Sequence, residues 1–138
     1  MLYILDTDHI SLLQRGHERV IINLSRVEIG RRAVTIVTVS EQVQGRLAVI
    51  RRSRTEIEAA RAFTNLQNTI AFYQAIHVLE YTEEAVAIFE KLRSQKIRVG
   101  TQDLRIAAIV LSQEATLVTR NSRDFAKIPD LSLEDWSV

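Results

Sequence analysis

The sequence contains no cysteine, few aromatic residues and no long hydrophobic run. Without cysteine, neither a disulfide framework nor a thiolate zinc site can form, so any metal must be bound by oxygen or histidine ligands. The longest apolar runs, residues 34–39 and 106–111, are far shorter than the roughly 18 residues that span a membrane. Because no secretory signal is visible at the N-terminus either, we expect a cytoplasmic protein without a membrane segment.

The aromatic residues make up 6% of the chain and are not interleaved with basic residues. This composition argues against a stacking platform of the kind found in single-strand-binding proteins. We expect three of the four phenylalanines, Phe63, Phe89 and Phe125, to lie in the core.

The 138 residues, 46% of them hydrophobic, suffice for one well-buried core and are too few for two ordinary domains, so we expect a single domain over residues 1–138. The formal net charge is +1, which lacks the strong basicity of many nucleic-acid binders. Basic residues nevertheless dominate the first half, where residues 1–61 hold ten arginines and seven acids.

Short apolar segments that alternate with longer helical patterns predict an α/β fold. We expect strands over residues 1–5, 33–39, 75–79 and 115–119, with a further edge strand over 131–133. Right-handed crossovers between them give a central parallel sheet of four to five short strands, flanked by helices on both faces.

Helical spacing of apolar residues places helices around residues 10–13 and 20–27, and over 54–73. A further helix begins near Glu41, one follows the N-cap Thr82, and one follows Thr101, which we expect to be its N-cap. Asp103 then lies in the first turn of that last helix.

Four acidic residues fall where strands end or helices begin. Asp6 follows the first strand, Glu41 follows the second, Asp103 opens a helix, and Asp124 with Asn121 follows the fourth strand. Because ligands of open α/β sheets bind beyond the carboxyl ends of the strands, these side chains are expected to share one rim.

Gathering carboxylates in one cleft is electrostatically costly, and a divalent cation resolves the conflict. Oxygen ligands with open positions filled by water suit Mg²⁺ or Mn²⁺, which can activate water and stabilise charge on a phosphate. For Glu41 or Asp103 alone, a role in helix capping or against the helix dipole is an equal alternative. Such a helix-terminal role explains Asp6 less well, since an acid at the end of a buried strand needs a partner to offset its desolvation.

Four segments carry a resemblance to a known family. They are residues 5–9 (LDTDH), 38–45 (TVSEQVQG), 100–108 (GTQDLRIAA) and 117–125 (LVTRNSRDF). In this order and spacing the chain resembles the VapC-like PIN-domain toxins over nearly its whole length. The resemblance implies a PIN-like fold and an endoribonuclease that uses Mg²⁺ or Mn²⁺, is held inactive by a VapB-like antitoxin, and forms a homodimer.

Position by position, the resemblance makes Asp6, Glu41, Asp103 and Asp124 the catalytic, metal-binding acids. Asn121 matches a polar position that would contribute through water or as a supporting group, and Thr7 and Thr119 would be supporting hydroxyls. The chain departs from the commonest pattern at Asp8, where asparagine is frequent, and we do not assign Asp8 to the metal.

The implied function is that of a toxin that hydrolyses RNA phosphodiesters, preferentially single-stranded, by metal-activated water. One alternative is a PIN-like module without catalytic activity that binds RNA or an antitoxin. Another takes Asp6 and Asp8 as the nucleophile and acid of an aspartate phosphatase, although no lysine follows a convincing strand.

The remaining charged and titratable residues give weaker signals. None of the three histidines has a metal-ligand spacing, and His9 stays open only because it lies close to Asp6. A run of arginines, Arg46, Arg51, Arg52 and Arg54, can contact RNA phosphates or an acidic antitoxin segment, or simply form a solvated helix face.

Overall fold

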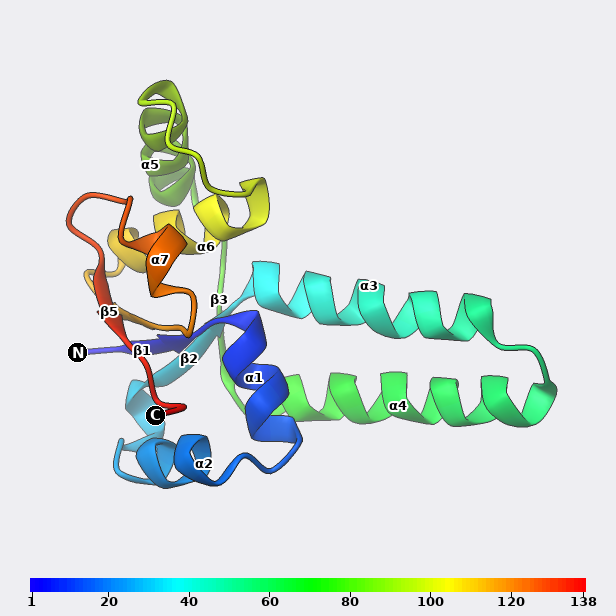
Figure 1. Ribbon diagram of the computed structural model, residues 1–138. Coiled ribbons are helices and arrows are strands. Elements are labelled where there is room, and N and C mark those ends of the chain that lie inside the picture. The colour runs from blue at the N-terminus through cyan, green and yellow to red at the C-terminus, as the bar shows by residue number, and fades with distance from the viewer.

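Five short parallel strands form the centre of the computed structural model, which describes residues 1–138 (Figure 1). The strands run in the order β3-β2-β1-β4-β5, and all four neighbouring pairs are parallel. Their bounds are β1 Tyr3–Leu5, β2 Arg32–Thr35, β3 His77–Leu79, β4 Thr116–Val118 and β5 Ser132–Glu134. The predicted α/β fold with a parallel sheet is therefore confirmed, including the last edge strand.

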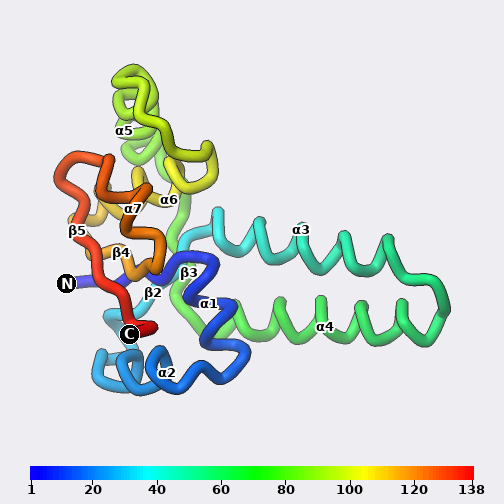
Figure 2. The backbone as a smooth tube through the Cα atoms, viewed as in Figure 1, coloured from blue at the N-terminus to red at the C-terminus, as the bar shows by residue number.

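Seven α-helices and one short 3₁₀ helix surround this sheet. The helices are α1 Thr7–Gln14, α2 Glu18–Ser25, α3 Ile36–Arg52, α4 Glu56–Gln74, α5 Glu83–Ser94, α6 Thr101–Ser112 and α7 Ser122–Phe125, with the 3₁₀ turn at Ile29–Arg31. Helices α3 and α4 pack against each other and project well beyond the sheet (Figures 1 and 2). We call this hairpin, residues 36–74, the arm. None of the helices is long and apolar enough to cross a membrane.

Side chains on the two faces of the sheet belong to two separate hydrophobic clusters. On β1, Ile4 packs into the cluster with α5, α6 and α7, whereas its neighbour Leu5 packs with residues of α1 and α4. Because successive strand residues point to opposite faces, a strand buried on both sides must be apolar throughout. Helices on both faces were predicted, and the two clusters confirm them.

The second strand is shorter than predicted, because residues 36–39 are helical. The hydroxyl of Thr35 accepts a hydrogen bond from the Thr38 N–H at 3.2 Å and so caps α3. The cap turns the chain into a helix at Ile36, although four β-branched residues favour a strand there. Glu41 consequently lies in the second turn of α3 and not at its start.

Two smaller predictions were also wrong. The N-cap of α6 is Gly100, and Thr101 is the first helical residue. Phe63 lies on the outer part of the arm with 56% of its surface exposed, whereas Phe89 and Phe125 are buried as predicted. Because the arm extends beyond the sheet, the apolar stripe of α4 is longer than the surface available to cover it.

Candidate active site

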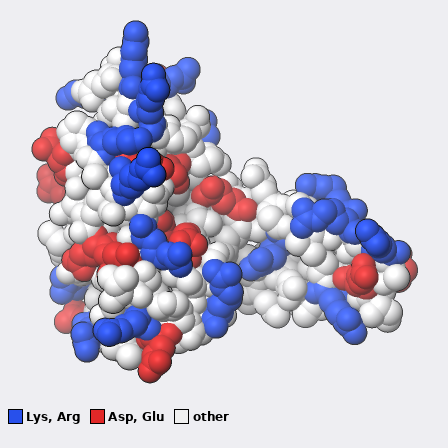
Figure 3. All heavy atoms as spheres, in the orientation of Figure 1, with Lys and Arg blue, Asp and Glu red and all other residues white.

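A polar cleft of about 440 Å³ opens where β1 and β4 end. The side chains that line it are Asp6, Thr7, Asp8, Ser11, Glu41, Asp103, Asn121 and Phe125. They come from α1 and the residue before it, from α3, from α6 and from the segment that follows β4. We call this the acidic cleft, since it contains four carboxylates and neither lysine nor arginine. In Figure 3 acidic side chains gather where the body of the protein meets the arm.

Asp6 is held at the base of the acidic cleft by its position between β1 and α1. It is the N-cap of α1, and its Oδ1 accepts a hydrogen bond from the His9 N–H at 2.8 Å. Its own N–H donates to the Val118 carbonyl at 3.0 Å, which ties the residue to β4. Only 7% of Asp6 is exposed, and no protein group donates to Oδ2. One carboxylate oxygen is thus free to bind a ligand.

Glu41 is oriented by a hydroxyl from a different element. The Thr7 Oγ1 donates to Glu41 Oε1 at 2.6 Å and lies 3.1 Å from the Thr38 Oγ1. The Thr7 hydroxyl has only one hydrogen, which it donates to the carboxylate. The Thr38 hydroxyl is therefore placed to donate to the Thr7 Oγ1. The position of Glu41 in the second turn of α3 also removes the alternative that it serves the helix N-terminus, since that effect is confined to the first turn.

Asp103 is the acid of the cleft whose ionised form is most disfavoured by its surroundings. It lies in the first turn of α6, is half-buried, and makes no side-chain hydrogen bond. Burial raises the pKa of its carboxyl above the usual value, and the nearby charges of Glu41, Asp6 and Asp124 raise it further. This is the behaviour expected of a carboxylate that lacks a positive partner.

Asp124 lies beside the acidic cleft and is better compensated. Its Oδ2 accepts a hydrogen bond from the Asn121 Nδ2 at 3.1 Å, and the Lys127 ammonium is 3.4 Å from its Oδ1. These two donors hold the pKa of Asp124 below its usual value. The buried Thr119 in turn accepts the Asn121 N–H at 2.9 Å, so the segment after β4 is held in place by its own side chains.

The structure brings three of the four predicted acids, Asp6, Glu41 and Asp103, into the lining of one cleft together with Asn121. Asp124 does not line it but acts on Asp103 through its charge. The lining also includes Asp8 and Ser11, which were not proposed as site residues. Both lie on α1 one turn apart, and the i, i+3 spacing from Asp8 is the sequence signal that could have identified Ser11.

Asp8 itself is exposed and pairs with a cation outside the cleft. Its Oδ2 lies 3.5 Å from the Arg120 Nε. Since both side chains are about half exposed, the pair contributes little to stability.

The donor set of the acidic cleft fits a hydrated divalent cation. No three histidine, aspartate or glutamate side chains lie close enough to form a ready-made metal-binding cluster. Mg²⁺, however, usually keeps several waters and is bound through only one or two carboxylates. Oxygen-only donors, the free Oδ2 of Asp6 and the unpaired Asp103 carboxyl suit Mg²⁺ or Mn²⁺, and the lining lacks the histidine or cysteine ligands typical of zinc sites.

His9 is structural in this arrangement. It is fully buried, and its Nε2 accepts the Trp136 N–H at 3.2 Å. Its Nδ1 makes no hydrogen bond of good geometry, although it lies 3.4 Å from the Asp6 Oδ1. His9 thus joins the C-terminal segment to the turn that carries Asp6.

Comparison with solved structures identifies the class of this fold. The VapBC-1 structure from nontypeable Haemophilus influenzae superposes with a TM-score of 0.79 at 24% identity, covering 100% of both chains. The DNA-bound VapBC from Salmonella typhimurium gives a TM-score of 0.77 at 26% identity and covers 99% of both chains. Together with the acids beyond β1 and β4, this similarity defines a PIN-like fold of the VapC type.

Sequence comparison leads to the same group. The chain is 29% identical to Ribonuclease VapC1 of Haemophilus influenzae over 143 aligned positions, covering 99% of both proteins. It is 30% identical to Ribonuclease VapC2 of Rickettsia felis, and 33% identical to the tRNA(fMet)-specific endonuclease VapC of Salmonella typhimurium. Those two matches span 52% and 58% of the relatives' lengths. No protein-family model matches the chain. In sequence and in fold the protein is VapC-like.

Proposed function

We propose that this protein is an endoribonuclease and the toxin of a toxin–antitoxin pair, with a VapB-like antitoxin as its partner. The observation that carries the proposal is the convergence of Asp6, Glu41 and Asp103 on one cleft at the carboxyl edge of the sheet. The names of the VapC relatives and the VapBC complexes among the similar structures support the same function. We further propose single-stranded RNA as the preferred substrate and a homodimer as the working form.

The proposed cofactor is Mg²⁺ or Mn²⁺, which Asp6, Glu41 and Asp103 would hold, one or two of them directly and the rest through water bound to the ion, with Asp124 and Asn121 contributing in the same way. When bound, such an ion would supply Lewis-acid stabilisation of the charge that develops on the phosphate during hydrolysis. The raised pKa of Asp103 supports this proposal, because a cation would favour the ionised form of a carboxyl that now lacks a positive partner.

The surrounding side chains would act by orientation. Thr7 fixes the rotamer of Glu41 through its 2.6 Å hydrogen bond. Asn121 fixes Asp124, and the N-cap interaction with the His9 N–H fixes Asp6. A site whose carboxylates are already held needs little rearrangement when RNA binds, which favours catalysis.

The experiment that tests this proposal is expression of the wild-type chain and of Asp6→Asn in cells that lack the antitoxin, followed by mapping of new RNA ends across total RNA. We expect discrete new cleavage sites and growth arrest with the wild type only. Equal growth and no new RNA ends with both chains would contradict nuclease activity. Growth arrest by both chains would favour a binding module that acts without catalysis.

A further inference from the structure

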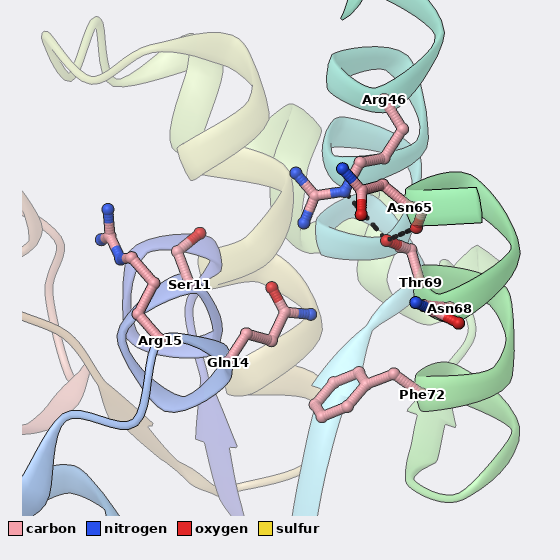
Figure 4. A pocket seen from close by; sticks show the side chains of 8 residues that line it. All are labelled: Ser11, Gln14, Arg15, Arg46, Asn65, Asn68, Thr69 and Phe72. Carbon is pink, nitrogen blue, oxygen red and sulfur yellow. Dashed lines mark hydrogen bonds between the residues drawn. The ribbon is translucent and has the colours of Figure 1, made fainter. Parts of the chain in front are cut away.

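A second hollow, of about 560 Å³, lies between α1 and the arm, next to the acidic cleft (Figure 4). We call it the arm pocket, and its lining comprises Ser11, Gln14, Arg15, Arg46, Asn65, Asn68, Thr69 and Phe72. Only Phe72 is hydrophobic. Ser11 lines both the arm pocket and the acidic cleft, so the two hollows are neighbours on the surface.

A hydrogen-bond network connects two lining residues of the arm pocket, Ser11 and Gln14, to the buried Gln42 and Tyr73. Gln42 exchanges hydrogen bonds with Gln14 at 3.0 and 3.1 Å and donates to the Ser11 Oγ at 3.2 Å. The Tyr73 hydroxyl donates to the Gln42 Oε1 at 2.6 Å. Gln42 is buried and directly follows Glu41 on α3. The same helical turn therefore carries a carboxylate of the cleft and the residue that binds two side chains of the pocket lining.

Two arginines on opposite sides of the arm pocket have no carboxylate partner. The Arg46 Nε donates to the buried Thr69 Oγ1 at 2.9 Å, and the terminal nitrogens of its guanidinium make no hydrogen bond. Arg15, the C-cap residue of α1, lies on the other side of the pocket with its guanidinium directed away from Arg46 (Figure 4), and it makes no side-chain hydrogen bond or ion pair. By contrast, the cations beside the acidic cleft, Arg120 and Lys127, are paired with acids.

The remaining lining offers groups that bind a base. The side-chain amides of Asn65 and Asn68 make no hydrogen bond within the protein and so present free donors and acceptors. Phe72 is half-buried, packs edge-on against Tyr73, and contributes its ring to the pocket. Arginine forks suit phosphates, amides suit base edges, and an aromatic ring stacks on an unpaired base.

We propose that the arm pocket is a nucleotide subsite for single-stranded RNA, next to the phosphodiester held in the acidic cleft. Arg15 and Arg46, on different sides of the pocket, each bind a backbone phosphate of the strand, and Phe72 stacks on one of its bases. This inference rests on the proposed nuclease function and adds the residues that bind substrate on one side of the cleaved bond.

Continuity of the surface favours RNA over a protein segment as the occupant. A third hollow of about 310 Å³ further along the arm shares Asn65 with the arm pocket and contains Arg52 and Arg61. Glu58 is the one acid in that lining, and most of the charged side chains at the far end of the arm are basic (Figure 3). Neighbouring hollows that share lining residues and lead from the carboxylates to this end match an extended polyanion. A docked protein segment would need more than one apolar side chain at the centre of its contact.

The test uses purified wild-type chain and three variants: Arg15→Gln, Phe72→Leu, and Arg19→Gln as the control. Arg19 is exposed on α2, outside the pocket lining, and its loss changes the net charge as Arg15→Gln does. Substrates are RNA oligonucleotides around one cleavage site, lengthened one nucleotide at a time on either side. Cleavage is measured as kcat/KM, and RNA binding by fluorescence anisotropy over a range of salt concentrations.

We expect nucleotides added on one side of the cleaved bond to raise kcat/KM, and those added on the other side to leave it unchanged. Arg15→Gln and Phe72→Leu should each lower kcat/KM for the lengthened substrates by about 5- to 50-fold. Arg19→Gln should cleave every substrate at the wild-type rate. Arg15→Gln should also reduce the salt slope of binding by about 0.7, the value for one phosphate contact on a single strand, whereas Arg19→Gln should not.

If the wild type cleaves RNA but Arg15→Gln and Arg19→Gln change kcat/KM and the salt slope equally, the subsite is overturned and the nuclease function stands. Unchanged RNA binding with weakened binding of an antitoxin peptide would overturn it in favour of a protein occupant. If the wild type cleaves nothing but binds RNA with the predicted dependence on Arg15 and Phe72, the nuclease function fails and the subsite stands.

Discussion

The Thr7 hydroxyl donates to the Glu41 carboxylate at 2.6 Å, which joins the first turn of α1 to the second turn of α3. This bond fixes the distance between two elements that each carry an acid of the cleft. Its removal should therefore disturb the site more than the fold.

Thr7→Val keeps the shape of the side chain and removes only the hydroxyl. We expect RNA cleavage to fall about 10- to 100-fold, as is typical when a group that orients a metal ligand is lost. Thr7→Ser, which keeps the hydroxyl, is the matched control and should retain most of the activity. A valine variant with wild-type activity would show that Glu41 does not need this orientation.

The cap formed by Asp6 allows its structural role to be separated from its chemical one. Asparagine caps helices about as well as aspartate, whereas alanine at an N-cap costs about 0.5–2 kcal/mol. We expect Asp6→Asn to unfold in urea near the wild-type midpoint and Asp6→Ala to unfold earlier by that amount. If both variants are equally destabilised, the negative charge and not the cap supports the turn.

Asp103 should make the folded protein less stable at neutral pH. Its pKa is raised in the folded state, chiefly by burial, so the folded state binds the proton more tightly than the unfolded chain. The tighter binding of this proton stabilises the folded protein fully at pH values below the unfolded-state pKa. That stabilisation is lost as pH rises through the raised folded-state pKa.

Asp103→Asn should accordingly raise Tm at pH 7 by about 2–5 °C, which corresponds to about 1 kcal/mol in a domain of this size. We do not expect a larger shift, because solvent screens a half-exposed carboxyl. The difference should shrink near pH 3, below the usual pKa of about 3.9. Glu90→Gln, an exposed change on α5, is the control. A lower Tm for Asp103→Asn would contradict this electrostatic account.

His9 should contribute to stability, because it is buried and accepts the Trp136 N–H at 3.2 Å. His9→Ala leaves a cavity and an unsatisfied donor, and we expect it to lower the free energy of unfolding by about 2–4 kcal/mol. His77→Ala, at an exposed position on β3, should change it by less than about 0.5 kcal/mol. Denaturant unfolding measures both, and equal small effects would mean that the C-terminal segment is not held through His9.

The sequence predicted the fold class and the positions of the acids well, because buried parallel strands and amphipathic helices leave clear apolar patterns. It failed at residues 36–39, where β-branched residues suggest a strand but the Thr35 cap and packing on both sides produce a helix. Local preference loses there to tertiary contacts, as it commonly does.

The arm pocket could not be predicted from the sequence, because it too depends on tertiary contacts. Arg15 and Phe72 lie far apart along the chain, and only the packing of α1 beside the arm brings them into one lining. The low aromatic content argued against stacking surfaces in general. A low aromatic content excludes repeated aromatic platforms but not a single ring such as Phe72 in a pocket that two arginines also line. Similarly, nothing in the pattern around Phe63 indicates that α4 extends beyond its partners and leaves this ring exposed.

The central claim is that carboxylates of the acidic cleft hydrolyse RNA with a divalent cation. The most direct measurement is cleavage of a fluorescent single-stranded RNA by purified wild type and Asp6→Asn, each with EDTA and then with Mg²⁺ or Mn²⁺ restored in excess. We predict cleavage by the wild type that EDTA abolishes and the cation restores, and at least about 100-fold less by Asp6→Asn at every cation concentration. Undiminished cleavage in EDTA, or by purified Asp6→Asn, would contradict the account.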